Sequence, residues 1–190
     1  MKISFAESAW NTDEMTYAYS WRFPETPVFV QKDDCVENLK NPAASCAGYD
    51  FISLLTKKKF GAGTKITTRC AFEGDAAPLI VFADELDTDE NGSKRYGNYF
   101  EVVLYKNGIN VWRLWKQADG TVTWHKRLGV EFPVSEGDIH TLSVEMKKDD
   151  LVIEADGRKI TLRAEDFFPA CHIGINACEG ICRFYDLSVT

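Results

Sequence analysis

Short β-rich runs separated by tight turns recur along almost the whole chain, and this pattern limits the fold more than any other feature. Turn residues stand between the runs at Lys106-Asn107-Gly108, Ala118-Asp119-Gly120, Asp156-Gly157 and Glu179-Gly180, and such residues close hairpins. No segment shows helical periodicity beyond a single turn at 164–168. The sequence therefore predicts an all-β protein, a two-sheet antiparallel sandwich or jelly roll, with strands at 27–31, 51–56, 65–72, 79–83, 99–106, 109–116, 121–127, 140–147, 151–155, 159–163, 172–177 and 182–189.

The composition indicates one domain, residues 1–190, because 45% of the residues are hydrophobic and 27% are charged. The net charge of −7 argues against nucleic acid as a partner, since the lysines at 57–59 are the only basic run. No segment approaches the roughly 18 apolar residues of a membrane span, and the N-terminus lacks the apolar core of a signal peptide. We expect no membrane partner. The chain as written is expected to be cytoplasmic, or secreted if a leader has been removed.

The cysteines do not have the spacing of a metal or redox site. They are Cys35, Cys46, Cys70, Cys171, Cys178 and Cys182. None forms the paired Cys-x-x-Cys spacing on which structural zinc sites and thiol oxidoreductases depend. We therefore predict buried, reduced thiols and no cofactor. The segment 32–49, which contains two of them, is predicted to be a long loop.

The turn at 106–108 decides which side chains share a face of the sheet. A three-residue loop with a left-handed glycine at Gly108 pairs Glu101 with Arg113 and Tyr99 with Trp115. A two-residue loop of Asn107 and Gly108 would instead bury Arg113 among apolar groups, which is costly without a partner. The three-residue loop is therefore preferred. It leaves an apolar set for the core face: Phe100, Val102, Leu104, Trp112 and Leu114.

The same rule applied to the turn at 118–120 adds a third strand. It pairs Arg113 with His125, and it pairs three further residues of 111–115 with their partners, namely Trp115 with Thr123, Leu114 with Trp124 and Val111 with Arg127. The result is a row of Glu101, Arg113 and His125 on one face. Tyr99 and Trp115 flank the row on one side, and Arg127 lies on the other side.

This row has the chemistry of a sugar site. Aromatic rings stack on the apolar faces of pyranoses, and charged groups bond to hydroxyls. Tyr99 and Trp115 would be the stacking platforms, with Glu101, Arg113, His125 and Arg127 as polar contacts. The alternative is an exposed cross-strand ion pair with His125 nearby by chance, a contact worth less than about 1 kcal/mol.

The acidic stretch DELDTDENG at 84–92 has three interpretations. Glu85, Asp87 and Glu90 match the E-x-D-x-x-E carboxylates of laminarinase-type glucanases. Those carboxylates lie on a strand, whereas this acidic run follows the predicted strand at 79–83 and leads into turn residues. The glucanase interpretation is therefore disfavoured.

The second interpretation is a calcium loop with Asp87, Asp89 and Asn91 as ligands. The twelfth position of such a loop would be Asn98 rather than the bidentate glutamate that completes it. Calcium is therefore only a weak alternative, and no metal site is predicted. The favoured interpretation is a solvated hairpin loop at the rim of the sandwich.

From about residue 50 onward, the chain resembles the concanavalin A-like lectin/glucanase superfamily. Within it, the chain is most similar to laminin-G-like domains and to the bacterial 3-keto-disaccharide hydrolase-like domain. The matching stretches carry the family's order of aromatics, glycines and strands, and they are 49–72, 78–84, 97–115, 136–162 and 172–189. The resemblance implies a curved jelly roll whose concave sheet holds carbohydrate. It includes no diagnostic catalytic signature, and residues 1–49 lie outside it.

Two functional hypotheses follow, since the fold alone does not select a function. The first is a carbohydrate-binding module or accessory subunit with an oligosaccharide or glycoside as ligand, and with a partner enzyme subunit or a second copy as possible protein partner. The alternative is a cytoplasmic hydrolase or lyase acting on a glycoside or 3-keto-glycoside. Glu101 and His125 would then be acid and base, and Arg113 would stabilise negative charge. A purely structural or protein-binding sandwich is a third class.

Overall fold

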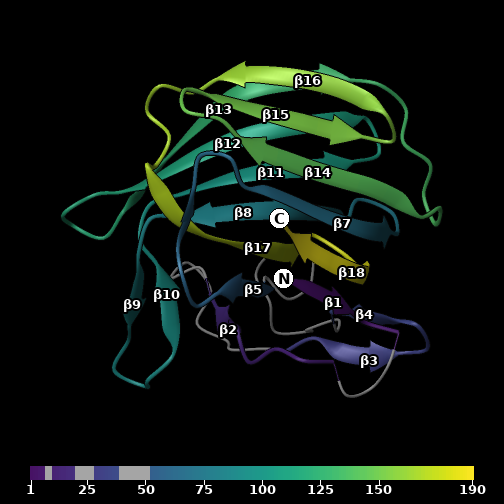
Figure 1. The fold of residues 1–190 in the computed structure, drawn as a ribbon, viewed down its shortest axis with the longest axis horizontal. Helices are drawn as coiled ribbons and strands as arrows, with labels where there is room; N and C mark the ends of the chain where they lie inside the picture. The colour runs from purple at the N-terminus through teal and green to yellow at the C-terminus, as the bar shows by residue number, and fades with distance from the viewer. Residues whose placement is uncertain (7–9, 20–27, 39–51) are drawn as a thin grey trace.

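A computed structural model describes residues 1–6, 10–19, 28–38 and 52–190. Within these residues every regular element is a strand, and the strands form two large antiparallel sheets and a separate hairpin (Figure 1). The prediction of an all-β two-sheet sandwich is confirmed. Among the described residues no helix has the length and apolar character needed to cross a membrane.

The first sheet, called the front sheet below, carries the candidate site. Its strand order is β13-β12-β11-β8-β17-β5-β2, with β6 paired to the start of β17. The strands are β2 (Met15–Ala18), β5 (Ile52–Thr56), β6 (Phe60–Gly61), β8 (Ala77–Ala83), β11 (Tyr99–Tyr105), β12 (Gly108–Lys116), β13 (Val122–Glu131) and β17 (Ala170–Cys178).

The second sheet, the back sheet, has the order β16-β15-β14-β7-β18-β4-β3, with β1 paired to β18. Asp156 and Gly157 join β15 to β16 with φ values of 47° and 80°, as a two-residue type I′ turn requires. The strands are β1 (Lys2–Ser4), β3 (Val30–Lys32), β4 (Cys35–Glu37), β7 (Lys65–Phe72), β14 (His140–Met146), β15 (Asp150–Ala155), β16 (Arg158–Arg163) and β18 (Cys182–Val189).

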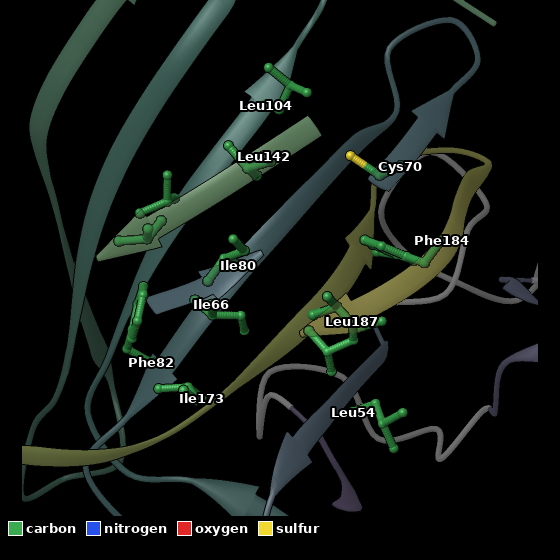
Figure 2. Packing of buried hydrophobic residues seen from close by; sticks show 14 of the residues in the cluster. Leu54, Ile66, Cys70, Ile80, Phe82, Leu104, Leu142, Ile173, Phe184 and Leu187 are labelled. Atoms are coloured by element: carbon green, nitrogen blue, oxygen red, sulfur yellow. The ribbon is translucent and has the colours of Figure 1, made fainter. Parts of the chain in front are cut away.

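The main core lies between the two sheets. Alternate side chains of the facing strands point inward, as the two-residue period of a strand requires. Figure 2 shows these residues interdigitating from both sheets, among them Leu54, Ile66, Ile80, Phe82, Leu104, Leu142, Ile173, Phe184 and Leu187. The predicted core residues Phe100, Val102 and Leu104 belong to this cluster.

A second apolar cluster lies on the outer face of the front sheet. It is built around Leu79, Val81, Tyr99 and Leu114, and it includes Tyr96 of the separate hairpin. This hairpin consists of β9 (Leu86–Thr88) and β10 (Lys94–Tyr96). The outer face of the front sheet is therefore partly a second core, covered by the hairpin.

The N-terminal segment is part of the sandwich, although the sequence analysis predicted only a strand at 27–31 and a long loop at 32–49 there. Strands β3 and β4 form a hairpin within the predicted loop 32–49, so that prediction is wrong for 32–37, and 39–49 lie outside the described residues. The predicted strand at 27–31 is observed only as β3. Strands β1, β2, β6, β9 and β10 were not predicted, because runs of four residues or fewer are too short to show alternation.

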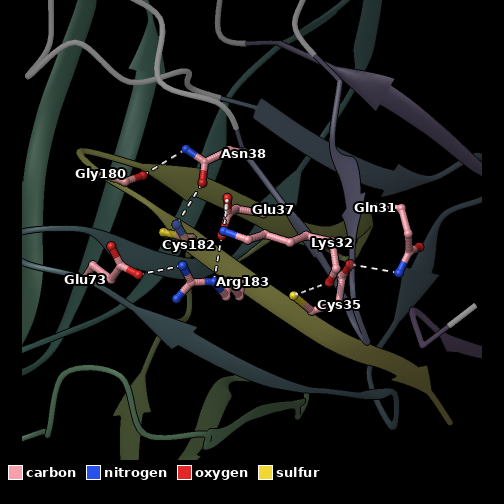
Figure 3. Close-up of polar contacts among 9 residues, drawn as sticks. All are labelled: Gln31, Lys32, Cys35, Glu37, Asn38, Glu73, Gly180, Cys182 and Arg183. Atoms are coloured by element: carbon pink, nitrogen blue, oxygen red, sulfur yellow. Dashed lines mark hydrogen bonds and ion pairs between the residues drawn. The ribbon is translucent and has the colours of Figure 1, made fainter. Parts of the chain in front are cut away.

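Buried polar contacts attach β4 to β18 (Figure 3). Glu37 accepts a hydrogen bond of 2.6 Å from Arg183 Nε and lies 3.3 Å from Lys32 Nζ. The side-chain oxygen of Asn38 accepts a bond of 2.8 Å from the backbone N–H of Cys182. Because Glu37 is buried, its pairing with Arg183 satisfies a charge that would be costly alone.

The five cysteines in the described residues are buried and not disulfide-bonded, as predicted. Burial raises the pKa of the Cys171 and Cys182 thiols to about 12. A thiol must ionise to react, so these side chains are inert packing groups. Cys46 lies outside the described residues.

Candidate functional site

Strand β11 pairs with β12 in a register one residue away from the predicted one. The turn holds only two residues, so that Glu101 pairs with Trp112 and Phe100 pairs with Arg113. The predicted pairing of Glu101 with Arg113 is therefore wrong. Opposed residues share a face and neighbours alternate, so Glu101 and Arg113 lie on opposite sides of the front sheet.

The role of Gly108 explains the difference. Gly108 is the first residue of β12 and pairs with both Tyr105 and Glu131. A Cβ at this position would lie 2.0 Å from the carbonyl oxygen of Val130, and φ is 131°. Glycine is thus required by the close approach of β13. It is not the left-handed residue of a three-residue loop.

The second hairpin follows the prediction over its first half. Gly120 has a φ of 84°, and the predicted pairs form: Arg113 with His125, Leu114 with Trp124 and Trp115 with Thr123. A β-bulge then follows between Val111 and Trp112, and Val111 pairs with Leu128 rather than with Arg127. The register is therefore right near the turn and wrong beyond the bulge.

The predicted polar contacts Arg113 and Arg127 form an ion-pair cluster on the inner side of the front sheet. Arg113 Nη1 and Arg127 Nη1 lie 2.6 and 2.5 Å from Asp166 Oδ2. The guanidinium of Arg113 also lies 3.8 Å from the ring centroid of Trp115, which stacks on Phe168. These contacts hold the segment before β17 against the sheet. They also occupy ring surface of Trp115, which was predicted to be a stacking platform for sugar.

This cluster predicts a pH dependence of stability. Partial burial acts to raise the pKa of Asp166, but its hydrogen bond to Arg127 and the charges of Arg127 and Arg113 outweigh it, and the pKa lies below the ordinary value. The carboxylate therefore stabilises the fold above its unfolded pKa of about 3.9, and this contribution is lost as the pH falls through the folded pKa.

We expect Asp166→Asn to lower the free energy of unfolding at pH 7 by about 1 kcal/mol, a modest value because the pair is partly exposed. The variant should also lose less stability than the native protein between pH 5 and the acid limit. Urea denaturation at a series of pH values measures both effects. Parallel pH profiles for the two proteins would show that the cluster contributes nothing.

Tyr99 and His125, which were also predicted to belong to the sugar site, lie on opposite faces of the front sheet. Tyr99 is on the same face as Glu101, but it is only 2% exposed and its ring lies 4.8 Å from that of Tyr96. His125 is exposed and shares the face of Arg113. Of the predicted site residues, only Glu101 remains at an open part of the outer face. The structure does not bring it together with Arg113 and His125 in one site.

That open part is a hollow with a volume of about 580 Å³. It is formed by outward side chains of β8, β11, β12 and β13 and by the end of β17. Leu79 and Val103 supply apolar lining, while Glu101, Trp112 and Trp124 supply the groups with recognition chemistry. Its size falls in the range of about 300–1,000 Å³ that is typical of small-molecule sites.

Two tryptophans give the hollow its aromatic wall. The ring centroids of Trp112 and Trp124 lie 6.5 Å apart at an interplanar angle of 78°. Trp124 is 42% exposed, and Lys126 Nζ lies 5.8 Å from the Trp112 ring centroid. A large exposed aromatic surface beside a cationic side chain can stack on a ligand with apolar C–H faces.

Polar groups are few and converge on the same hollow. Glu101 lines it and is only 4% exposed. Asn110 is also in the lining. Its side-chain oxygen is buried without a hydrogen-bond partner among the described residues, and a small rotation of the amide would let a ligand hydroxyl supply the missing partner. Apolar walls with a few convergent polar groups are typical of ligand sites.

Trp112, Trp124 and Asn110 were not predicted as site residues. In the predicted register Trp112 and Trp124 face the core, because a shift of one residue exchanges the two faces of a strand. Asn110 could have revealed the error. The predicted register places its amide opposite Leu104 in the core, whereas the observed register pairs Asn110 with Val103 on the outer face.

Comparison with known proteins connects this architecture to solved structures. No protein-family model matches the chain, and no curated protein matches its sequence. The carbohydrate-binding module CBM66 from Bacillus subtilis superposes with a TM-score of 0.64 at 12% identity, covering 93% of this chain and 94% of that one. A glycoside hydrolase family 16 endo-glucanase from Bacteroides ovatus gives 0.64 at 13% identity, covering 100% and 99%.

The β-porphyranase BpGH16B from the gut bacterium Bacteroides plebeius gives a TM-score of 0.66 at 11% identity, with 98% and 89% covered. The fold is a concanavalin A-like jelly roll. The resemblance seen in the sequence is thereby confirmed at the level of the fold.

In this concanavalin A-like jelly roll, the stretch DELDTDENG forms the β9–β10 hairpin. Asp89 Oδ1 accepts hydrogen bonds of 2.9 Å from the backbone N–H groups of Asn91 and Ser93, and Asp89 Oδ2 accepts one of 2.8 Å from Arg95 Nε. The stretch forms a hairpin, as the favoured interpretation predicted, although 86–88 are strand β9 rather than loop.

Acidic residues on which the glucanase and calcium interpretations depend form ion pairs with lysines of the chain. Glu85 pairs with Lys59, and Asp87 lies 3.6 Å from Lys116. Over the described residues, no group of three or more His, Cys, Asp or Glu side chains is placed to hold a metal ion. The acidic hairpin thus acts in the jelly roll as a structural cover of the front sheet.

Proposed function

We propose that the protein binds a carbohydrate in the hollow on the outer face of the front sheet. One observation carries the proposal: Trp112 and Trp124 form an aromatic wall in a hollow that is also lined by the polar residues Glu101 and Asn110. Sugars present C–H faces that stack on aromatic rings and hydroxyls that bond to carboxylate and amide oxygens.

The same fold carries carbohydrate chemistry in other proteins. The structures with similar folds include a carbohydrate-binding module and glycoside hydrolases. Fold alone does not transfer a function, so the comparison supports the ligand class only together with the hollow. The accessory-subunit and homo-oligomer predictions concern protein partners and remain predictions.

The charges of the hollow favour a neutral sugar over an acidic one. Three acidic residues line it, namely Asp75, Glu101 and Glu179, against one lining cation, Lys106, and a second cation, Lys126, beside the Trp112 ring. Lys106 Nζ lies 2.6 Å from Asp75, so that charge is already matched. A uronate or sulfated sugar would meet an excess of negative charge, which is unfavourable.

The second candidate is a glycosidase or lyase that uses Glu101, which is favoured by the burial of that carboxylate in a ligand-sized hollow. Glycosidases generally need two carboxyl groups about 5–9.5 Å apart. The other acidic residues of the lining lie at the ends of β8 and β17, level with Ala77, whereas Glu101 pairs with Val81. Four residues at about 3.4 Å each place them roughly 14 Å apart along the strand. Binding is therefore supported better than hydrolysis.

Titration of Glu101→Gln against neutral oligosaccharides tests the proposal. Glutamine keeps the size and loses the charge, so we expect binding to weaken about tenfold, the value of a charged hydrogen bond over a neutral one. Glu154→Gln on β15 of the back sheet should bind as the native protein does. Calorimetry that detects no neutral sugar bound by the native protein would rule out the proposed function. Sugar turnover that is lost in Glu101→Gln would favour the enzyme.

A further inference from the structure

The outer face of the front sheet is divided into a covered part and a hollowed part. Along β11 the outward side chains are Tyr99, Glu101, Val103 and Tyr105. Tyr99 is buried beneath the hairpin, whereas the other three line the hollow. The boundary lies between two successive outward positions, Tyr99 and Glu101.

The neighbouring strand β12 has its boundary at the same level. Trp112, the partner of Glu101, lines the hollow. Leu114, the next outward residue, is fully buried in the outer apolar cluster, which Leu86 of β9 and Tyr96 of β10 complete. The hairpin therefore forms a wall across the sheet at one end of the hollow.

Hydrogen bonds fix this wall to the sheet. The Tyr96 hydroxyl bonds with Ser53 Oγ of β5 and accepts a bond of 3.2 Å from Asn176 Nδ2 of β17. The backbone of Tyr96 donates to Tyr19 O at 3.2 Å, and Tyr19 donates to Lys94 O at 3.0 Å. Figure 1 shows β9 and β10 beside β2 at this end of the sandwich. The wall is an integral part of the fold.

Among the described residues, the hollow is bordered on two further sides. Asn176 of β17 and its partner Ser53 of β5 point outward and are fully buried under the Tyr96 hydroxyl. At the end opposite the hairpin, an exposed ion pair between Lys106 and Asp75 joins the β11–β12 turn to the segment before β8. The remaining side is the edge strand β13, where Trp124 is exposed.

We propose that this hollow is blind-ended and takes the terminal units of a linear sugar chain, or a short oligosaccharide. The rest of the chain leaves past Trp124. The proposal rests on the carbohydrate function proposed above and adds the mode of recognition. A groove open at both ends would accept an internal stretch of a polysaccharide, whereas a hollow that ends at the buried cluster beneath the hairpin requires a chain end.

A chain-length series tests the proposal with the native protein. The probes are neutral linear glucans, mannans, galactans and fructans, each as di- to hexasaccharides and as the polymer. Calorimetry gives the affinity and the number of protein molecules bound per sugar chain. For the series that binds, we expect the affinity to stop rising after the first few units. We also expect one protein molecule to bind per sugar chain at every length. A given mass of sugar should therefore bind more protein when its chains are shorter.

Several protein molecules per polymer chain, in a number that grows with chain length, would overturn the blind-ended hollow and leave the carbohydrate function in place. Absence of binding by every series would instead defeat the carbohydrate function, and this inference with it. The two failures are therefore distinguishable in one experiment.

Discussion

Replacing Trp124 by alanine is expected to weaken oligosaccharide binding at least tenfold while the fold is retained. Trp124 is 42% exposed at the open side of the hollow, so its truncation removes little core packing. It removes one of the two aromatic surfaces available for stacking, and tryptophans that a ligand covers commonly contribute about 2 kcal/mol or more to binding, which is more than tenfold in affinity.

Tyr185→Ala provides the matched control for Trp124→Ala. Tyr185 is a partly exposed aromatic residue on β18 of the back sheet, away from the hollow. We expect this variant to bind sugar with native affinity. Calorimetry compares the affinities, and circular dichroism confirms the fold. Equal losses in both variants would mean that the sugar does not rest on Trp124.

Replacing Gly108 by alanine is expected to destabilise the protein by about 3 kcal/mol or more, the range of backbone strain combined with a steric clash. The new Cβ would lie 2.0 Å from the carbonyl oxygen of Val130. That oxygen belongs to the backbone of β13 and cannot move aside without displacing the strand. The positive φ of 131° adds strain for any residue with a side chain.

Gly120→Ala separates these two effects. Gly120 also has a positive φ, of 84°, but nothing lies within 4 Å of a Cβ added there. Its replacement should cost only the conformational strain, about 1–2 kcal/mol. Urea unfolding measures both variants. If Gly108→Ala were no worse than Gly120→Ala, the close approach of β13 to Gly108 would be incorrect, and with it the register that builds the hollow.

Much of the fold could be predicted because its strands are long and its turns carry specific residues. The strands predicted at 65–72 and 182–189 coincide with β7 and β18. Asp156 and Gly157 adopt the turn that their residue types require. The short strands β1 and β2 were missed because three or four residues are too few to show alternation. Strand β4 was missed because its position depends on tertiary contacts, such as the pairing of Glu37 with Arg183.

The site could be predicted only in part, because it depends on a register. Glycine at 108 fits both a left-handed turn position and a close approach of strands, and only the position of β13 decides between them. The predicted three-residue turn shifted the pairing of β12 with β11 by one residue. This shift placed Arg113 beside Glu101 and placed Trp112 in the core. The bulge at Val111 and Trp112 has no signal in the sequence that would have corrected Arg127.

Crystals soaked with a short neutral oligosaccharide test the central claim most directly, namely that Glu101, Trp112 and Trp124 share one ligand-binding face. Electron density for sugar is predicted in the hollow, with a ring stacked on Trp124 or Trp112 and hydroxyls within hydrogen-bond distance of Asn110 Oδ1 and Glu101. Sugar bound on the opposite side of the front sheet, beside Arg113 and His125, would contradict this account.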